Sequence, residues 1–299
     1  MGLQKYWRIV FVAVLLALAM IYREEAERIV NIVVSSPPWL FFACLFLVVA
    51  EFLLQALRMK LVFSKNWAEI LRAYAVGLMV ALSFPSRTLG EGARIAVMAK
   101  ELKVKKEEMA AYVSVERVAD VVVLATAASL VLLEVHPFLL AAAVLGICTF
   151  LAVIESDTVY RKVNRGPVPE LLRKYIEESR KIVKDRALFA AILGISVVLW
   201  GIDFLRMWAV VHTMGGTIDY TAVASLVSLA YIVSALSFLP GGLGVYEGGL
   251  AGGLVLKGVP HDVAVAATLY ERLFSYWLWI LVGAAAGAFK RENGSSSTA

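Results

Sequence analysis

The chain has 299 residues, 61% of them hydrophobic, a mean hydropathy of +0.78 and a net charge of +5. Soluble domains are about 45–50% apolar, so this composition excludes an ordinary soluble protein and predicts an all-α, polytopic membrane protein. The two cysteines lie in apolar segments and the three histidines are scattered, a pattern that indicates neither a disulfide framework nor a zinc site. We expect no metal, no cofactor and no nucleic-acid partner.

Apolar runs along the chain predict the membrane-spanning helices. The first run, residues 7–22, has Lys5 and Arg8 near its start, which is typical of a first helix with its N-terminus in the cytoplasm or of a cleaved signal sequence. Five further runs are expected to cross the membrane: 39–63, 110–133, 137–154, 187–212 and 262–288. Two other apolar stretches, 70–99 and 220–257, are interrupted by proline and glycine.

The one long polar segment, residues 155–186, contains nine of the 29 basic residues. Apolar side chains recur in it at helical spacing, at Leu172, Tyr175, Ile176, Ile182 and Val183. This predicts an amphipathic helix on the cytoplasmic face, where each basic residue near anionic lipid contributes ~1 kcal/mol. A solvated linker between two halves is the alternative. We expect one transmembrane domain over residues 1–290 and a disordered, serine-rich tail at 291–299.

The two interrupted stretches resemble each other and have similar neighbours. Residues 83–92 read SFPSRTLGEG, and residues 237–249 read SFLPGGLGVYEGG. A Leu-Arg-Met triplet precedes each stretch, at 57–59 and 205–207, and a Glu-Arg pair follows each, at 116–117 and 271–272. The shared order of these anchors predicts a duplication, with one repeat unit at about 39–133 and the other at about 187–288.

The placement of basic residues predicts how the two units face. If both interrupted stretches crossed the membrane, the eight spans would leave Arg58, Lys60, Lys65 and Arg72 outside, against the positive-inside pattern. If each stretch instead enters and returns as a re-entrant hairpin, about six helices cross and both termini lie in the cytoplasm. The hairpins then enter from opposite sides, which is the inverted-topology repeat of secondary transporters.

A chain that turns back inside the bilayer needs particular residues at its tip. Proline ends the entering helix and glycine permits the turn, as Pro85 with Gly90 and Pro240 with Gly241 would do here. The returning half-helix then presents unpaired N–H groups, which suit an anionic headgroup. The alternative is that the glycines only let helices pack closely.

Ionisable residues within the apolar runs point to the same region. Each costs at least ~2.5–3.5 kcal/mol near the bilayer centre, so several together are expected to pair with one another or to serve a function. Structural salt bridges are the alternative to a functional role. The candidate lipid-binding residues are Arg87, Gly90, Glu91, Arg94, Glu116, Arg117, Asp203, Arg206, Pro240, Gly241, Gly242, Gly244, Glu247, Glu271 and Arg272; the same buried set includes Glu51 and Asp120.

The motifs identify a family. The Pro-x-Arg-x-x-Gly-Glu segment from Pro85 to Glu91, the Pro-Gly-Gly-x-Gly-x-x-Glu segment from Pro240 to Glu247, and the arginines Arg117 and Arg272 resemble those of the lysylphosphatidylglycerol synthase transmembrane-region family, over nearly the whole chain. The resemblance implies a flippase-like membrane module. Because the chain stops soon after its last apolar run, it implies no lysyl transfer and leaves the cargo open.

We therefore expect a cell-membrane flippase that moves an anionic or polyprenyl-phosphate-type lipid between leaflets, with membrane lipids as its partners. The alternatives are a lipid-modifying membrane enzyme, an ion-coupled small-solute transporter and a scaffold for another membrane protein. The enzyme is disfavoured because the sequence has no HExxH motif and no Ser-His-Asp set. The sequence leaves the oligomeric state open.

Overall fold

In the computed structural model, the described residues are 23–84, 87–135, 145, 149, 154, 156–165, 169–235, 237, 239 and 242–285. The apolar run 7–22, nearly all of the run 137–154, and the tail 291–299 lie outside them. Every regular element in the described ranges is a helix, which confirms the all-α class. These elements are α2 (Arg23–Ser35), α3 (Pro38–Val62), α4 (Trp67–Ser83), α5 (Arg87–Leu102), α6 (Lys106–Val135), α8 (Asp157–Arg165), α9 (Glu170–Lys184), α10 (Arg186–Thr213), α11 (Tyr220–Ala235), α12 (Val245–Leu256), α13 (His261–Arg272) and the π-helix η2 (Leu273–Trp277).

Helices α3 and α10 pack against each other and between them contact α4, α6, α11 and α13, and we call them the central pair. They have 25 and 28 residues. Among the described helices, these two are long enough and apolar enough to cross a membrane. At 1.5 Å per residue each is about 38–42 Å long, more than the ~30 Å of hydrocarbon in a bilayer. Proline at the N-terminus of α3 and the Asp185 carboxylate, which accepts a hydrogen bond from the Leu188 N–H at the start of α10, fix where the two helices begin.

The outer surface carries large apolar side chains. Phe42 and Phe46 of α3, Val197 of α10, and Trp277 and Leu281 near the C-terminal end are all exposed. The buried residues include arginine and glutamate. Apolar groups outside and charges inside are the arrangement that lipid, rather than water, selects.

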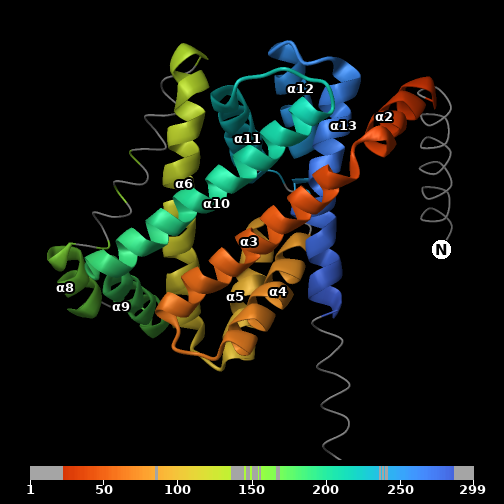
Figure 1. Cartoon of the computed structure of the whole chain (residues 1–299). Coiled ribbons are helices and arrows are strands. Elements are labelled where there is room, and N and C mark those ends of the chain that lie inside the picture. Colours follow the sequence, from red (N-terminus) through yellow and green to blue (C-terminus); the bar gives the residue numbers. More distant parts are fainter. Residues whose placement is uncertain are drawn as a thin grey trace, which may run out of the picture.

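Two helical hairpins pack at opposite ends of the central pair. Helices α4 and α5 form one hairpin, and α11 and α12 form the other. Figure 1 shows α4–α5 in the lower half and α11–α12 in the upper half, with α3 and α10 crossing between α6 and α13. In each hairpin, the end of the first helix and the start of the second lie toward the middle of the bundle (Figure 1).

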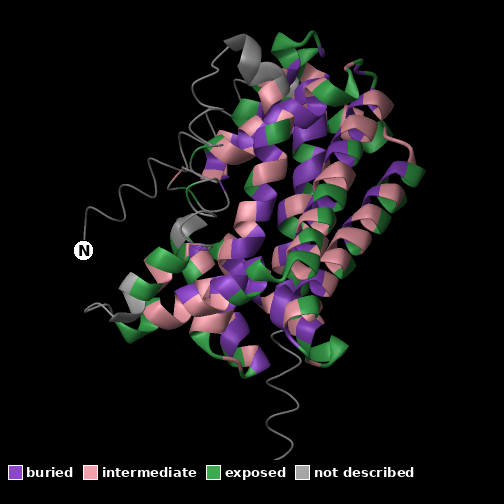
Figure 2. Ribbon diagram, turned by 90° about the vertical axis from the view of Figure 1, so that its left-hand side faces the viewer, coloured by how far each residue is buried: buried purple, intermediate pink, exposed green. Residues whose placement is uncertain are grey.

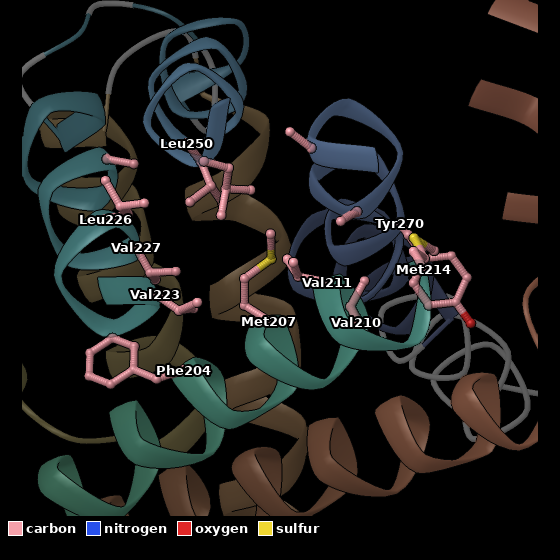
Figure 3. Close-up of a cluster of buried hydrophobic side chains, with 14 of the residues drawn as sticks. Phe204, Met207, Val210, Val211, Met214, Val223, Leu226, Val227, Leu250 and Tyr270 are labelled. Atoms are coloured by element: carbon pink, nitrogen blue, oxygen red, sulfur yellow. The ribbon is translucent and has the colours of Figure 1, made fainter. Parts of the chain in front are cut away.

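Each hairpin has its own apolar core. Residues of α4, α5 and α6 pack with the C-terminal part of α3 in one core. Residues of α11, α12 and α13 pack with the C-terminal part of α10 in the other, where Met207, Leu226 and Leu250 point into one interior (Figure 3). Figure 2 shows buried residues along the middle of the bundle and exposed residues at its ends and outer faces. The two cores hold the hairpins against the central helices.

The glycines serve two different purposes. A Cβ atom at Gly90 would lie 2.4 Å from the backbone oxygen of Ala81, so glycine is what lets α4 and α5 approach this closely. Gly242 and Gly244 instead have φ of +71° and +82° in the turn before α12, a conformation that favours glycine. Pro85, Pro240 and Gly241 lie outside the described residues.

The polar segment contains two helices, α8 and α9. The amphipathic pattern predicted a helix where α9 lies and did not predict α8. The apolar side of α9, with Ile176, Ile182 and Val183 buried, packs against α6 and α10. Protein therefore covers most of the face that the sequence assigned to lipid. Next to this buried face, Arg180 and Lys184 donate hydrogen bonds to Asp157, which lower the pKa of its carboxyl group.

Candidate functional site

A cavity of about 170 Å³ lies between the two hairpins and the central helices. Its lining comes from α3, α4, α6, α10, α11, α12, α13 and η2, and both halves of the chain contribute charged side chains to it. Arg117 and Asp120 come from the first half, while Asp203, Arg206 and Arg272 come from the second. The cavity is therefore where the buried charges of the two halves meet.

The first charge cluster consists of Arg58, Glu91, Arg94, Glu116, Arg117 and Asp120. Its centre is Glu116, which is fully buried on α6 and lies 3.3, 3.1 and 3.0 Å from the guanidinium nitrogens of Arg58, Arg94 and Arg117. Arg94 and Arg117 also contact Glu91 at 3.2 and 3.3 Å. Three guanidinium groups thus share two carboxylates, with Asp120 as a third acceptor for Arg58 and Arg117.

The second charge cluster consists of Glu51, Asp203, Arg206, Glu247, Glu271 and Arg272. Its centre is Arg206, which is 1% exposed and donates to Glu51, Asp203 and Glu271, the last at 3.1 Å. Arg272 donates to Glu247 and lies over the ring of Tyr246, 4.0 Å from its centroid. Four carboxylates therefore surround two guanidinium groups.

The same two contacts occur in each cluster. The arginine of each Leu-Arg-Met triplet pairs with the glutamate of the following Glu-Arg pair, Arg58 with Glu116 at 3.3 Å and Arg206 with Glu271 at 3.1 Å. The arginine of each Glu-Arg pair contacts the hairpin glutamate, Arg117 with Glu91 and Arg272 with Glu247. The anchors that recur in the sequence are the residues that meet in space.

Glu247 also caps a helix. The Gly244 N–H donates to the Glu247 carboxylate at 2.6 Å, in the first turn of α12, where a negative charge is favourable. This N–H is one of the tip donors that the sequence assigned to an anionic headgroup. The protein's own carboxylate already occupies it.

The π-helix η2 directly follows Arg272. Ser275, within it, donates to the second carboxylate oxygen of Glu271 at 3.0 Å, while the first accepts from Arg206. The extra residue in such a turn often marks a functional site. Here it brings a hydroxyl group to a carboxylate at the cavity wall.

Most of the candidate residues predicted from the sequence lie in one of the two charge clusters, with some exceptions. The side chain of Arg87 lies outside the described residues, as do Pro240 and Gly241. Gly90, Gly242 and Gly244 shape the hairpins and do not line the cavity, and Arg94 lies behind the wall, fully buried. Arg58 was absent from the candidates, although its place in the repeated Leu-Arg-Met triplet marks it as the counterpart of Arg206. Gln55 was also absent from the candidates, although its spacing puts it on one helical face with Glu51 and Arg58. The cavity-lining Tyr74, Tyr231 and Tyr246 were absent too, and no motif in the sequence marks them.

The fold and the site define a helical membrane protein that encloses a charged cavity within its bundle. The chain belongs to the family described as the lysylphosphatidylglycerol synthase TM region, whose model matches residues 6–283. This match confirms the resemblance that the motifs indicated.

Several archaeal proteins are similar to this chain. A UPF0104 membrane protein of Methanothermobacter thermautotrophicus is 29% identical over 119 residues, which are 40% of this chain and 35% of that protein. A UPF0104 membrane protein of Pyrococcus horikoshii is 28% identical over 112 residues, 38% of this chain and 33% of that protein. These matches cover about a third of each relative. A UPF0104 membrane protein of Methanocaldococcus jannaschii is 22% identical over 92% of both chains.

Proposed function

We propose that the protein moves a membrane lipid between leaflets through the central cavity. The observation that carries the proposal is that one cavity is lined by residues of both hairpins, by Arg117 of the first Glu-Arg pair and by both residues of the second. In secondary transporters, substrate sites lie near the bilayer midplane where broken helices of two repeats meet. The family's description as the transmembrane region of a lysylphosphatidylglycerol synthase supports a role in lipid chemistry.

We further propose that α3–α6 and α10–α13 are inverted repeats. The recurring pairs Arg58 with Glu116 and Arg206 with Glu271 support this pairing of elements, as do the hairpins at opposite ends of the central pair (Figure 1). In this arrangement about six helices span the cell membrane and the hairpins are re-entrant. The turns on either side of α4–α5 carry Lys65, Lys103 and Lys105, so that end faces the cytoplasm by the positive-inside rule, and both termini lie there.

The cargo in this proposal is a lipid with a phosphate or another anionic group. Arg117 is the arginine most open to the cavity, with 32% of its side chain exposed, and guanidinium groups bind phosphate through paired donors. A cavity of 170 Å³ is smaller than the ~300–1,000 Å³ of pockets that enclose whole drug-sized ligands. It therefore suits a headgroup, while the acyl chains stay in the bilayer.

Reconstitution in liposomes tests this function. Three lipids are compared: phosphatidylglycerol, a polyprenyl phosphate and phosphatidylcholine, each labelled on the headgroup or chain. Quenching of the label in the outer leaflet measures how fast each lipid moves between leaflets. We expect faster movement of the anionic lipids with wild type than with Arg117→Gln, and no change with Arg161→Gln, an exposed arginine on α8. Equal rates for all lipids in wild type, Arg117→Gln and protein-free liposomes would refute the proposal. A changed lipid mass after incubation would instead favour a lipid-modifying enzyme.

A further inference from the structure

The two charge clusters differ in net charge. With every group ionised, the first cluster has three arginines and three carboxylates, and its net charge is zero. The second has two arginines and four carboxylates, and its net charge is −2. Uncompensated charge at membrane depth is costly, so the second cluster needs a cationic partner that the described side chains do not supply.

Four positions produce the difference. Glu51 of α3 joins the second cluster, and Ser275 stands four residues after Glu271 where Asp120 stands four residues after Glu116. Three residues before the central arginine stands Gln55 in the first half and Asp203 in the second, and each accepts a hydrogen bond from that arginine, Arg58 or Arg206. Three residues after the hairpin glutamate stands Arg94 in the first half, whereas Leu250, fully buried in the apolar core, takes this place in the second. Asp203 in place of Gln55, Leu250 in place of Arg94, and the added Glu51 each make the second cluster more negative by one charge, and Ser275 in place of Asp120 makes it less negative by one.

The contacts of the four carboxylates point to two of them as the place for a cation. Glu271 accepts through both oxygens, from Arg206 and Ser275. Glu247 also accepts through both, from Arg272 and the Gly244 N–H. Glu51 and Asp203 each accept from Arg206 through a single oxygen, and both line the cavity.

The arginine between them leaves one buried donor without an acceptor among the described residues, as do the three arginines of the first cluster. Arg206 is 1% exposed, and its buried Nε–H has no acceptor among the described residues. A buried donor without an acceptor is costly, and a water molecule in the cavity would satisfy it. Such a water also provides the route by which a proton reaches Asp203.

We propose that Asp203 and Glu51 form a proton-binding site that exchanges one proton with the cavity. A proton transferred from water to a carboxylate oxygen lowers the negative charge of the cluster by one without moving any side chain. A metal ion is a poorer fit, because no three His, Cys, Asp or Glu side chains in the described part of the chain are placed to hold one. Several titratable or charged groups face this site. They are Cys44 of α3, Tyr246 and Glu247 of α12, Glu271 and Arg272 of α13, and, across the cavity, Tyr74 of α4, Arg117 and Asp120 of α6 and Tyr231 of α11.

Proton binding couples to the lipid if the proposed function holds. An anionic headgroup at Arg117 or Arg272 is repelled by the excess negative charge, and a proton on Asp203 or Glu51 weakens that repulsion. Each ligand then favours binding of the other, by the reciprocity of linked equilibria. The lipid and the proton therefore cross in the same direction.

Infrared difference spectra test the proton site without any transport. Purified protein in phosphatidylcholine nanodiscs is titrated from acid to alkaline pH, and the C=O stretch of protonated carboxylic acids is followed. We expect wild type to lose such a band as the pH rises and Asp203→Asn and Glu51→Gln each to reduce it. Glu108→Gln, outside both clusters, should leave unchanged the part of the band that persists above the ordinary titration range of glutamate. A wild type without the band, a band that survives in both Asp203→Asn and Glu51→Gln, or a titration shifted by sodium in place of choline would overturn the proposal.

A pH gradient across liposomes tests the coupling. For one proton moved with each lipid, a gradient of one pH unit accumulates labelled phosphatidylglycerol about tenfold in the leaflet on the alkaline side. Asp203→Asn should abolish accumulation and keep downhill movement. Equal accumulation in this variant and in wild type would overturn the coupling. An infrared band without movement of any lipid would refute the lipid function and leave the proton site intact. Lipid movement without the band would refute the proton site and leave the lipid function intact.

Discussion

Replacing Glu116 by glutamine should destabilise the protein strongly. The carboxylate is fully buried and lies within 3.3 Å of three guanidinium groups, those of Arg58, Arg94 and Arg117. Removing one partner of a buried ion pair costs about 3–5 kcal/mol because the other charge stays buried. With three arginines sharing this one acceptor, we expect a loss near 5 kcal/mol, a large part of the ~5–15 kcal/mol that holds a typical domain folded.

Reversible unfolding in mixed micelles of a mild detergent and dodecyl sulfate measures this loss. Glu108→Gln on the same helix is the matched control, because its partner Lys105 lies 3.8 Å away at the surface, and we expect a change below ~0.5 kcal/mol. The double variant Glu116→Gln with Arg94→Leu, which copies Leu250 of the other half, should recover about 1–3 kcal/mol of the summed single losses. A loss below ~1 kcal/mol for Glu116→Gln, or strict additivity in the double variant, would refute this account of the first cluster.

Three further predictions concern the hairpins and the polar segment. Gly90→Ala should cost about 1–3 kcal/mol, because the new Cβ meets the Ala81 oxygen at 2.4 Å, whereas Gly92→Ala, with nothing within 4 Å, should leave the melting temperature unchanged or higher. Equal effects of the two would contradict the close packing of α4 on α5. Glu247→Ala removes both the cap of α12 and the partner of Arg272, so backbone hydrogen exchange should rise in the first turn of α12; Glu247→Gln should raise it less, and unchanged exchange in both variants would count against the cap. Hydrogen bonds from Arg180 and Lys184 lower the pKa of Asp157 below its ordinary 3.8, so this contact stabilises α8 on α9 above that value and is lost as the pH falls through the lowered pKa. Protease cleavage between α8 and α9 should therefore increase at pH values below 3.8 in wild type, and Asp157→Asn should be cleaved faster at neutral pH as well; a pH-independent rate in wild type would contradict the role of this carboxylate.

The sequence was sufficient to predict the helical class, the two hairpins and the charged residues around the cavity. Its most informative feature was the recurrence of the Glu-Arg pairs and the Leu-Arg-Met triplets, since residues at equivalent places in two copies tend to make equivalent contacts. The same recurrence predicts that Arg58 belongs to the site as the counterpart of Arg206. Its position near the end of an apolar run instead suggested a place close to the membrane surface. Its full burial depends on α6 and α10, which no local pattern specifies.

Other contacts depended on tertiary packing. The glycine at position 90 reads as a turn residue, and its proximity to Ala81 follows only from how α4 and α5 cross. The apolar face of α9 has the spacing of a lipid-binding helix, and a protein surface on α6 satisfies that spacing equally well. The capping role of Glu247 requires the turn conformation of Gly244, and a carboxylate in an apolar run gives no indication of its partner.

The reciprocal contacts between α3 and α10 limit how this molecule can move. Arg206 of α10 donates a hydrogen bond to Glu51 of α3, and Arg58 of α3 donates one to Ser196 of α10. These two contacts lie seven residues apart on α3, about 10 Å along its axis. Helices α3 and α10 therefore cannot rotate relative to each other about a single point. Any rearrangement that exposes the cavity first to one leaflet and then to the other must therefore move the hairpins relative to α3 and α10, which stay together as one rigid unit.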